Sequence, residues 1–89
     1  MPKKILAALA LLHAAAACAV DVNTAIPADL DGLKGIGPAL SRTILEERRK
    51  NGEFRNWQDF IARTRGMGKS KAGALSGAGL TVNGAGYGN

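Results

Sequence analysis

The apolar residues of this chain recur with the spacing of short helices. The longest such segment begins at Pro38, which can occupy the first position of a helix without losing a hydrogen bond. Positions i, i+1, i+4, i+5 and i+8 form one face of this helix, and they hold Leu40, Ser41, Ile44, Leu45 and Arg48. Asn51-Gly52 ends the segment, because glycine readily adopts the left-handed conformation that follows a helix.

Three shorter helices are predicted around this one. The first begins at Pro27, for the same reason as the helix at Pro38. Another follows Asn56, an N-cap residue, and Asp59 three residues later gives a pattern that resembles a capping box. The last covers Ser70 to Leu75, and Gly73 lowers its helical propensity.

The segments outside these helices are predicted to be extended or mobile. Residues 20–25 form an extended lead-in, Leu80 and Val82 fold back on the helices, and residues 83–89 form a flexible, glycine-rich tail. The pattern therefore predicts a compact all-α domain of four to five helices over residues 20–82. Its predicted core consists of apolar residues from the helices and their connections: Leu30, Leu33, Ile36, Leu40, Ile44, Leu45, Phe54, Trp57, Phe60, Ile61, Met67, Ala72 and Leu75.

Residues 1–19 have the pattern of a secretory signal peptide. Lys3 and Lys4 precede an unbroken apolar run at 5–12, and Ala17-Cys18-Ala19 fits a small-x-small cleavage site. We therefore expect export and cleavage near Ala19.

Two alternatives to cleavage stay open. The segment could be an uncleaved membrane anchor, although the apolar span from Ile5 to Val20 is short for a transmembrane helix. Cys18 could instead be lipidated, although Ala15 stands where a lipoprotein site usually has a larger aliphatic residue.

The net charge of the chain is positive both before and after the expected cleavage. Twelve Lys and Arg against seven Asp and Glu give a net charge of +5, and ten bases against seven acids, net +3, would remain without residues 1–19. Clustering of these charges matters more than their sum. Arg48, Arg49 and Lys50 suit either a ligand or an ordinary solvated helix C-terminus. Cys18 is the only cysteine, so the sequence predicts no disulfide framework.

Two short motifs repeat at a separation of thirty-one residues. Leu33-Lys34-Gly35-Ile36-Gly37-Pro38 and Thr64-Arg65-Gly66-Met67-Gly68-Lys69 each place a Gly-apolar-Gly triplet after a base and before a predicted helix. The glycines let the backbone turn sharply and approach a ligand closely. The helix that follows directs free N–H groups and the positive end of its dipole at the same point, which favours a phosphate.

Two such motifs in a small basic chain indicate that one nucleic-acid backbone is held at two points. The predicted DNA-binding residues are those of the two motifs and the bases beside them: Lys34, Gly35, Ile36, Gly37, Arg65, Gly66, Met67, Gly68, Lys69 and Lys71.

Other chemistry is disfavoured by the sequence. Trp57 and Phe60 could stack on bases, but their helical spacing favours core packing. Asp59 invites a comparison with glycosylases, but a capping role explains it, and the chain is too small to enclose a flipped base. Residues 20–89 contain no Ser/His/Asp or Cys/His set and no metal-ligand spacing, so we predict no enzyme, no cofactor and no metal.

The order of four motifs resembles that of tandem helix-hairpin-helix proteins: Asp21-Val22-Asn23-Thr24-Ala25, Leu33-Lys34-Gly35-Ile36-Gly37, Asn51-Gly52-Glu53-Phe54 and Arg65-Gly66-Met67-Gly68. Over about Val20 to Leu80 the chain is similar to the ComEA-type competence proteins of Gram-negative bacteria. It departs from their pattern at Ile26, where a capping Ser, Thr or Asp is usual, and at Thr64, where an aliphatic residue is usual.

This resemblance implies a tandem helix-hairpin-helix fold and non-specific binding of double-stranded DNA in the periplasm, for uptake in natural transformation. It also implies that the hairpin amides contact phosphates and that Lys34, Arg65 and Lys69 flank them. The predicted partners are duplex DNA and the DNA-uptake machinery, with no small-molecule substrate and no stable membrane span after cleavage. The alternative is an envelope module that uses the same fold to dock a protein partner and does not bind DNA.

Overall fold

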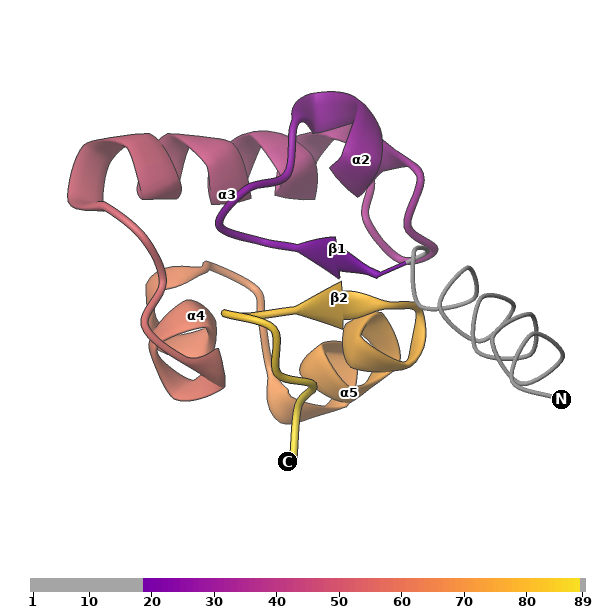
Figure 1. Cartoon of the computed structure of the whole chain (residues 1–89). Helices are drawn as coiled ribbons and strands as arrows, with labels where there is room; N and C mark the ends of the chain where they lie inside the picture. The colour runs from indigo at the N-terminus through magenta and orange to yellow at the C-terminus, as the bar shows by residue number, and fades with distance from the viewer. Residues whose placement is uncertain (1–18, 89) are drawn as a thin grey trace, which may run out of the picture.

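The computed structural model describes residues 19–88, so the predicted signal peptide lies outside the described residues except for Ala19. Four helices and two short strands follow in chain order: β1 (Val20–Asp21), α2 (Pro27–Asp31), α3 (Pro38–Asn51), α4 (Trp57–Arg63), α5 (Lys69–Gly77) and β2 (Leu80–Thr81). The all-α prediction is confirmed, and the strand pair is a minor addition to it. Figure 1 shows α3 along one side of the domain, α4 and α5 along the other, and the strands between them.

Three helices begin at the residue that the sequence predicts, and α5 begins one residue earlier than predicted, at Lys69. At α2 and α4 an aspartate of the first turn accepts a backbone hydrogen bond, and only at α4 is this bond displaced from the N-cap residue. The Asn56 side-chain oxygen accepts a hydrogen bond from the Asp59 amide at 2.8 Å, as expected for an N-cap. The Asp59 carboxylate, however, accepts from the amide of Arg55, one residue before the N-cap, at 3.0 Å. At α2 the cap residue Ile26 has no side-chain acceptor, but its amide donates to the Asp29 carboxylate at 3.1 Å.

The parallel strand pair joins the two ends of the domain, and the sequence pattern does not predict it. Val20 pairs with Leu80 and Asp21 with Thr81, because the chain returns after α5 to lie beside the segment that precedes α2. The Asp21 carboxylate accepts hydrogen bonds from the Thr81 hydroxyl at 2.8 Å and the Gly84 amide at 2.7 Å. Two-residue strands are too short to show an alternating pattern, so sequence reasoning sees only an extended lead-in.

The core contains most of the predicted residues and four others. Leu40, Leu45 and Ile61 are only half-buried at its edge, whereas the rest of the predicted set is buried. The additional core residues come from the extended segments at the two ends of the domain: Val22, Ala25, Leu80 and Val82. The predicted fold-back of Leu80 and Val82 is thus observed, and it brings the second strand into the core.

Residues 83–88 differ from the free tail that their glycine content suggests. The indole N–H of Trp57 donates to the carbonyl of Ala85 at 2.8 Å, and the Tyr87 ring lies 5.4 Å from that of Trp57. Asn83 accepts from the Asn23 side chain at 2.9 Å and donates to the carbonyl of Arg55 at 3.0 Å. We call residues 83–88 the C-terminal clasp, because they connect the segment before α2 to α4.

Candidate functional site

The first hairpin connects α2 to α3 through a tight turn. The amide of Ile36 donates to the carbonyl of Leu33 at 3.1 Å, which closes the turn. Gly35 has a φ of +99°, a conformation that disfavours a residue with a side chain. Gly37 is extended and forms the N-cap of α3, so the helix starts directly after the turn.

The second hairpin repeats this geometry between α4 and α5. The amide of Met67 donates to the carbonyl of Thr64 at 3.1 Å, Gly66 has a φ of +84°, and Gly68 forms the extended N-cap of α5. The two predicted motifs therefore fold into equivalent turns, although their flanking residues differ.

The hairpin geometry divides the predicted contact residues into two groups. The amides of Ile36 and Met67 are used inside the turns, and their side chains are buried in the core. These two residues hold the hairpins to the domain. The amides of Gly35, Gly37, Gly66 and Gly68 form no hydrogen bond among residues 19–88, and they are the hairpin donors that a ligand can use.

The first turns of α3 and α5 add further donors. Neither cap glycine has a side chain that could accept from the helix amides, so no side-chain cap hydrogen bond is formed at the start of either helix. The amides of Ala39 and Ser70, which the sequence analysis did not select, are thus also available to an anion. Their position directly after the Gly-apolar-Gly triplet is the signal that could have identified them.

The predicted cations stand at the surface beside these amides. Lys34, Arg65, Lys69 and Lys71 are all exposed. In the described part of the chain, the ion pairs involve Arg55 and Arg63 but none of these four residues. Their charges therefore remain available to a ligand.

Two other arginines are committed to the fold. The guanidinium of Arg48 donates to the carbonyls of Val22 and Ala25 at 2.9 and 2.8 Å, which connects the segment before α2 to α3. This settles the open choice for Arg48 in favour of a structural role. Arg63 donates to the carboxylates of Glu47 and Asp59, both at 2.9 Å.

The environment of Arg63 also changes the pKa of its partners. The hydrogen bond from Arg63 is the main cause that lowers the pKa of Glu47 from its ordinary value. The pKa of Asp59 falls to about 2, first through the Arg55 amide and then through Arg63. The guanidinium of Arg63 also lies 4.3 Å from the centroid of the Phe54 ring. Asp59 is thus part of a network that joins α3 to α4, and this structural role replaces the comparison with glycosylases.

Helix α5 links the two hairpins. It begins at the second hairpin, and the side chain of its Leu75 reaches the first: a Cβ atom at Gly35 would lie 3.3 Å from Leu75 Cδ2. Lys34 and Gly35 also share a shallow hollow with Ala74 and Gly77 of α5. From Gly68 to Leu75 a helix advances about 10 Å, so the two hairpins are separated by the length of a short helix.

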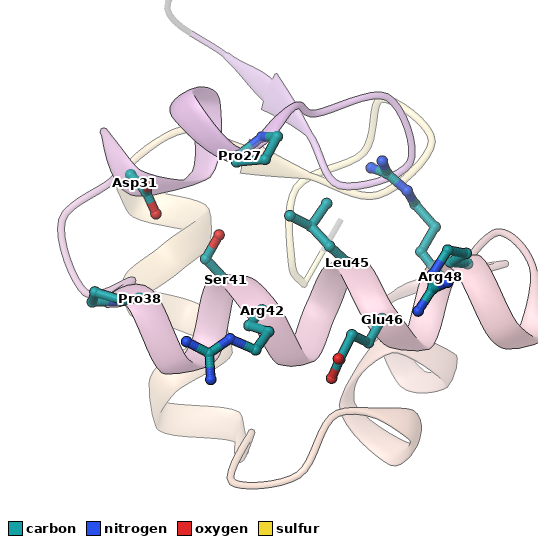
Figure 2. Close-up of a pocket in the computed structure, with 9 residues that line it drawn as sticks. Pro27, Asp31, Pro38, Ser41, Arg42, Leu45, Glu46 and Arg48 are labelled. Atoms are coloured by element: carbon teal, nitrogen blue, oxygen red, sulfur yellow. The ribbon is translucent and has the colours of Figure 1, made fainter.

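A second hollow lies between α2 and α3, away from the α5 contact. Its lining residues include Pro27, Asp31, Pro38, Ser41, Arg42, Leu45, Glu46, Arg48 and Arg49. Figure 2 shows Ser41 and Leu45 on the side of α3 that faces α2, and Arg42 and Glu46 directed away from it. Because Asp31 and Glu46 stand among its arginines, this hollow lacks the single sign of charge that would attract a phosphate.

Two further properties concern the described residues. Between residues 19 and 88, no three His, Cys, Asp or Glu side chains are placed to hold a metal ion. None of the described helices has the length and apolar character needed to cross a membrane.

Comparison with known families identifies the family to which the chain belongs. Residues 15–77 match the family model of the helix-hairpin-helix motif. The chain belongs to the helix-hairpin-helix family. Both hairpins lie inside the matched range, and each is followed by the helix that this name describes.

Two relatives of this helix-hairpin-helix chain cover only parts of it. ComE operon protein 1 of Bacillus subtilis (strain 168) is 36% identical over 50 residues, which are 56% of this chain and 24% of that protein. DNA polymerase III subunit alpha of Chlamydia muridarum (strain MoPn / Nigg) is 46% identical over 35 residues, 39% of this chain and 3% of the polymerase subunit. The chain thus spans a quarter or less of either relative. The first match supports the ComEA-type resemblance, and no solved structure was found to match the chain.

Proposed function

We propose that this chain binds double-stranded DNA without sequence preference, by holding its phosphates at two hairpins. The proposal rests above all on the equivalent turns at Gly35–Gly37 and Gly66–Gly68, each of which leaves amides free in front of a helix and has exposed bases beside it. A helix N-terminus with free amides is suited to a phosphate oxygen, and the nearby lysines and arginines add attraction at longer range.

The absence of sequence preference follows from the kind of contact. Backbone amides and flexible lysines recognise phosphate oxygens, which are the same for every base pair. Neither hairpin presents the Asn, Gln or paired Arg side chains that read base edges in the major groove. The affinity should therefore come from phosphates and fall steeply with salt.

The biological role we propose is capture of incoming DNA in the periplasm during natural transformation. The similarity to a protein named for the ComE operon supports this role, and so does the signal-peptide pattern of residues 1–19. In this role the protein is a binding module and has no enzymatic activity. Components of the DNA-uptake machinery are its further proposed partners.

Binding can be tested with the purified full chain and two fluorescent duplexes of unrelated sequence. We expect equal affinities for both, with a dissociation constant of about 10⁻⁴ to 10⁻⁶ M at physiological salt. Gly68→Leu should weaken binding to both duplexes, because a side chain there would keep the phosphate away from the backbone. Gly68 is extended, and a Cβ atom at this position would meet no other atom within 4 Å, so the fold itself should accept the substitution.

The matched control is Ala62→Leu, which adds a similar side chain at an exposed position of α4. It should leave binding unchanged. Circular dichroism of each variant checks that the helices are retained. If the wild-type chain binds neither duplex, the proposed function is wrong, and the protein-docking alternative gains support.

A further inference from the structure

The two hairpins differ in the charge of the segments that support them. Residues 27–45, which span α2, the first hairpin and the first half of α3, contain two bases and two acids, a net charge of zero. Residues 57–77, which span α4, the second hairpin and α5, contain four bases and one acid, a net charge of +3. No acidic residue follows Asp59 in the chain.

Glu47 and Asp59 are already paired. Glu47 accepts from Arg63 at 2.9 Å, and Asp59 accepts from Arg63 at 2.9 Å and lies 3.5 Å from the Arg55 guanidinium, so two arginines balance the two carboxylates within the domain. Glu46 shares a surface hollow with Arg65, but the two form no ion pair among the described residues, and Lys50 lines the same hollow. Arg65, like Lys69 and Lys71 in the first turn of α5, thus keeps its charge for a ligand.

The segment around the first hairpin has no such excess of bases over acids. Lys34 is the only base within the turn, and Asp31 lies three residues before it on α2. Asp31 also lines the hollow that contains Pro38 and Arg42, so an acid accompanies the nearest arginine. Pro38 has no amide hydrogen, which removes one donor that Lys69 provides at the equivalent position of α5.

We infer that the two hairpins hold one duplex unequally. The second hairpin supplies most of the ionic attraction, and the first contributes mainly uncharged hydrogen bonds from its amides. This inference rests on the proposed function and extends it, because it assigns the salt-dependent part of the affinity to Arg65, Lys69 and Lys71.

Three double variants, each of which removes two positive charges, test this division. The second-hairpin variant is Arg65→Gln with Lys69→Gln, the first-hairpin variant is Lys34→Gln with Arg42→Gln, and the control is Arg49→Gln with Arg55→Gln. All six side chains are exposed, so folding should be retained. The affinity of each full-length variant for one duplex is measured between about 50 and 200 mM salt.

The affinity for DNA falls as the salt concentration rises over this range. For each phosphate contact that is lost, this fall becomes about 3.5-fold smaller. We therefore expect a reduction of about 12-fold for the second-hairpin variant, no more than about 3.5-fold for the first-hairpin variant, and no change for the control. Equal reductions at the two hairpins would overturn the inference while leaving DNA binding intact. A control variant as affected as the second-hairpin variant would overturn it too, since net charge alone would then explain the effect. Failure of the wild-type chain to bind any duplex would contradict the proposed function itself.

Discussion

The first and second halves of the domain build the same turn with different support. In the first half, the hairpin leads into α3, whose fourteen residues contain no glycine before the C-cap. In the second half, it leads into the nine-residue α5, which contains Gly73 and ends with Gly77. A short helix with glycines is weak on its own, so the second half requires contacts from elsewhere in the chain.

Those contacts come from aromatic rings and from the C-terminal clasp. The ring of Phe60 packs edge to face with those of Phe54 and Trp57, at centroid distances of 5.0 and 5.6 Å, and Tyr87 of the clasp gives Trp57 a second ring contact. The amide of Tyr87 also donates to the Ser76 hydroxyl of α5 at 2.9 Å. The comparison shows that one turn geometry can be maintained either by a long helix or by tertiary packing.

The largest effect that we predict is at Trp57. Trp57→Ala removes a ring that is only 4% exposed together with its hydrogen bond to Ala85. It should lower the free energy of unfolding by about 3–5 kcal/mol, which is enough to unfold a domain of this size. Urea denaturation followed by circular dichroism measures the loss.

The matched substitution in the first half is Leu45→Ala, at a half-buried position of α3. It should cost clearly less than Trp57→Ala. Equal losses would show that the two halves depend on side-chain packing to the same degree. A folded Trp57→Ala variant that has lost DNA binding would instead reassign Trp57 to the interface.

The second prediction concerns a defect beside the second hairpin. Thr64 is 2% exposed, and its hydroxyl has no hydrogen-bond partner among the described residues. Thr64→Val removes this buried polar group at nearly constant volume, so it should raise the free energy of unfolding by about 1 kcal/mol. The carbonyl of Thr64, which closes the turn, is unaffected by the substitution.

Thr43→Val is the control, because the Thr43 hydroxyl donates to the carbonyl of Ala39 at 3.0 Å. Removal of a satisfied hydroxyl should not stabilise the domain. Thermal melts of both variants compare the two effects. A destabilised Thr64→Val variant would indicate that the Thr64 hydroxyl has a role in the folded protein.

The same contrast explains how much of the structure was accessible from sequence. The glycines and prolines of the hairpins act locally, so the positions of both turns and of all four helices could be predicted from residues such as Pro38 and Gly66. The strand pair and the clasp could not, because they depend on contacts such as Asn23 with Asn83, sixty residues apart in the chain. The glycines of the C-terminal clasp suggest a mobile segment, and only the folded chain shows that Trp57 binds it.

The sequence likewise indicates the residues of the candidate site but not the role of each one. Its bases and glycines are visible in the motifs, and the cations at Lys34, Arg65, Lys69 and Lys71 are exposed as a ligand site requires. The use of the Ile36 and Met67 amides inside the turns was not visible, because their role depends on the direction of each N–H group. The commitment of Arg48 to the carbonyls of Val22 and Ala25 likewise required the folded chain.

The smallest effect that we predict is a pH dependence at the surface network of the second half. The pKa of Asp59 is lowered from 3.8 to about 2, with the hydrogen bond from the Arg55 amide as the main cause. A carboxylate whose pKa is lower in the folded state stabilises the fold above its unfolded pKa, and this contribution is lost as the pH falls through the folded value. The Arg55 side chain is 83% exposed, so solvent screens its share of the attraction.

Asp59→Asn should therefore destabilise the domain at pH 7 and lose this difference from the wild-type chain as the pH falls from 3.8 toward 2. Glu53→Gln is the control, because Glu53 is exposed and its side chain forms no ion pair in the described chain. Urea denaturation of the three proteins at pH 7 and at pH values across this range gives the comparison. If the difference between wild type and Asp59→Asn stayed constant down to pH 2, the Asp59 carboxylate would not be the titrating group. Ionisation of Asp59 would then contribute nothing to the stability of the second half, and the contrast with the first half would rest on the aromatic rings and the clasp.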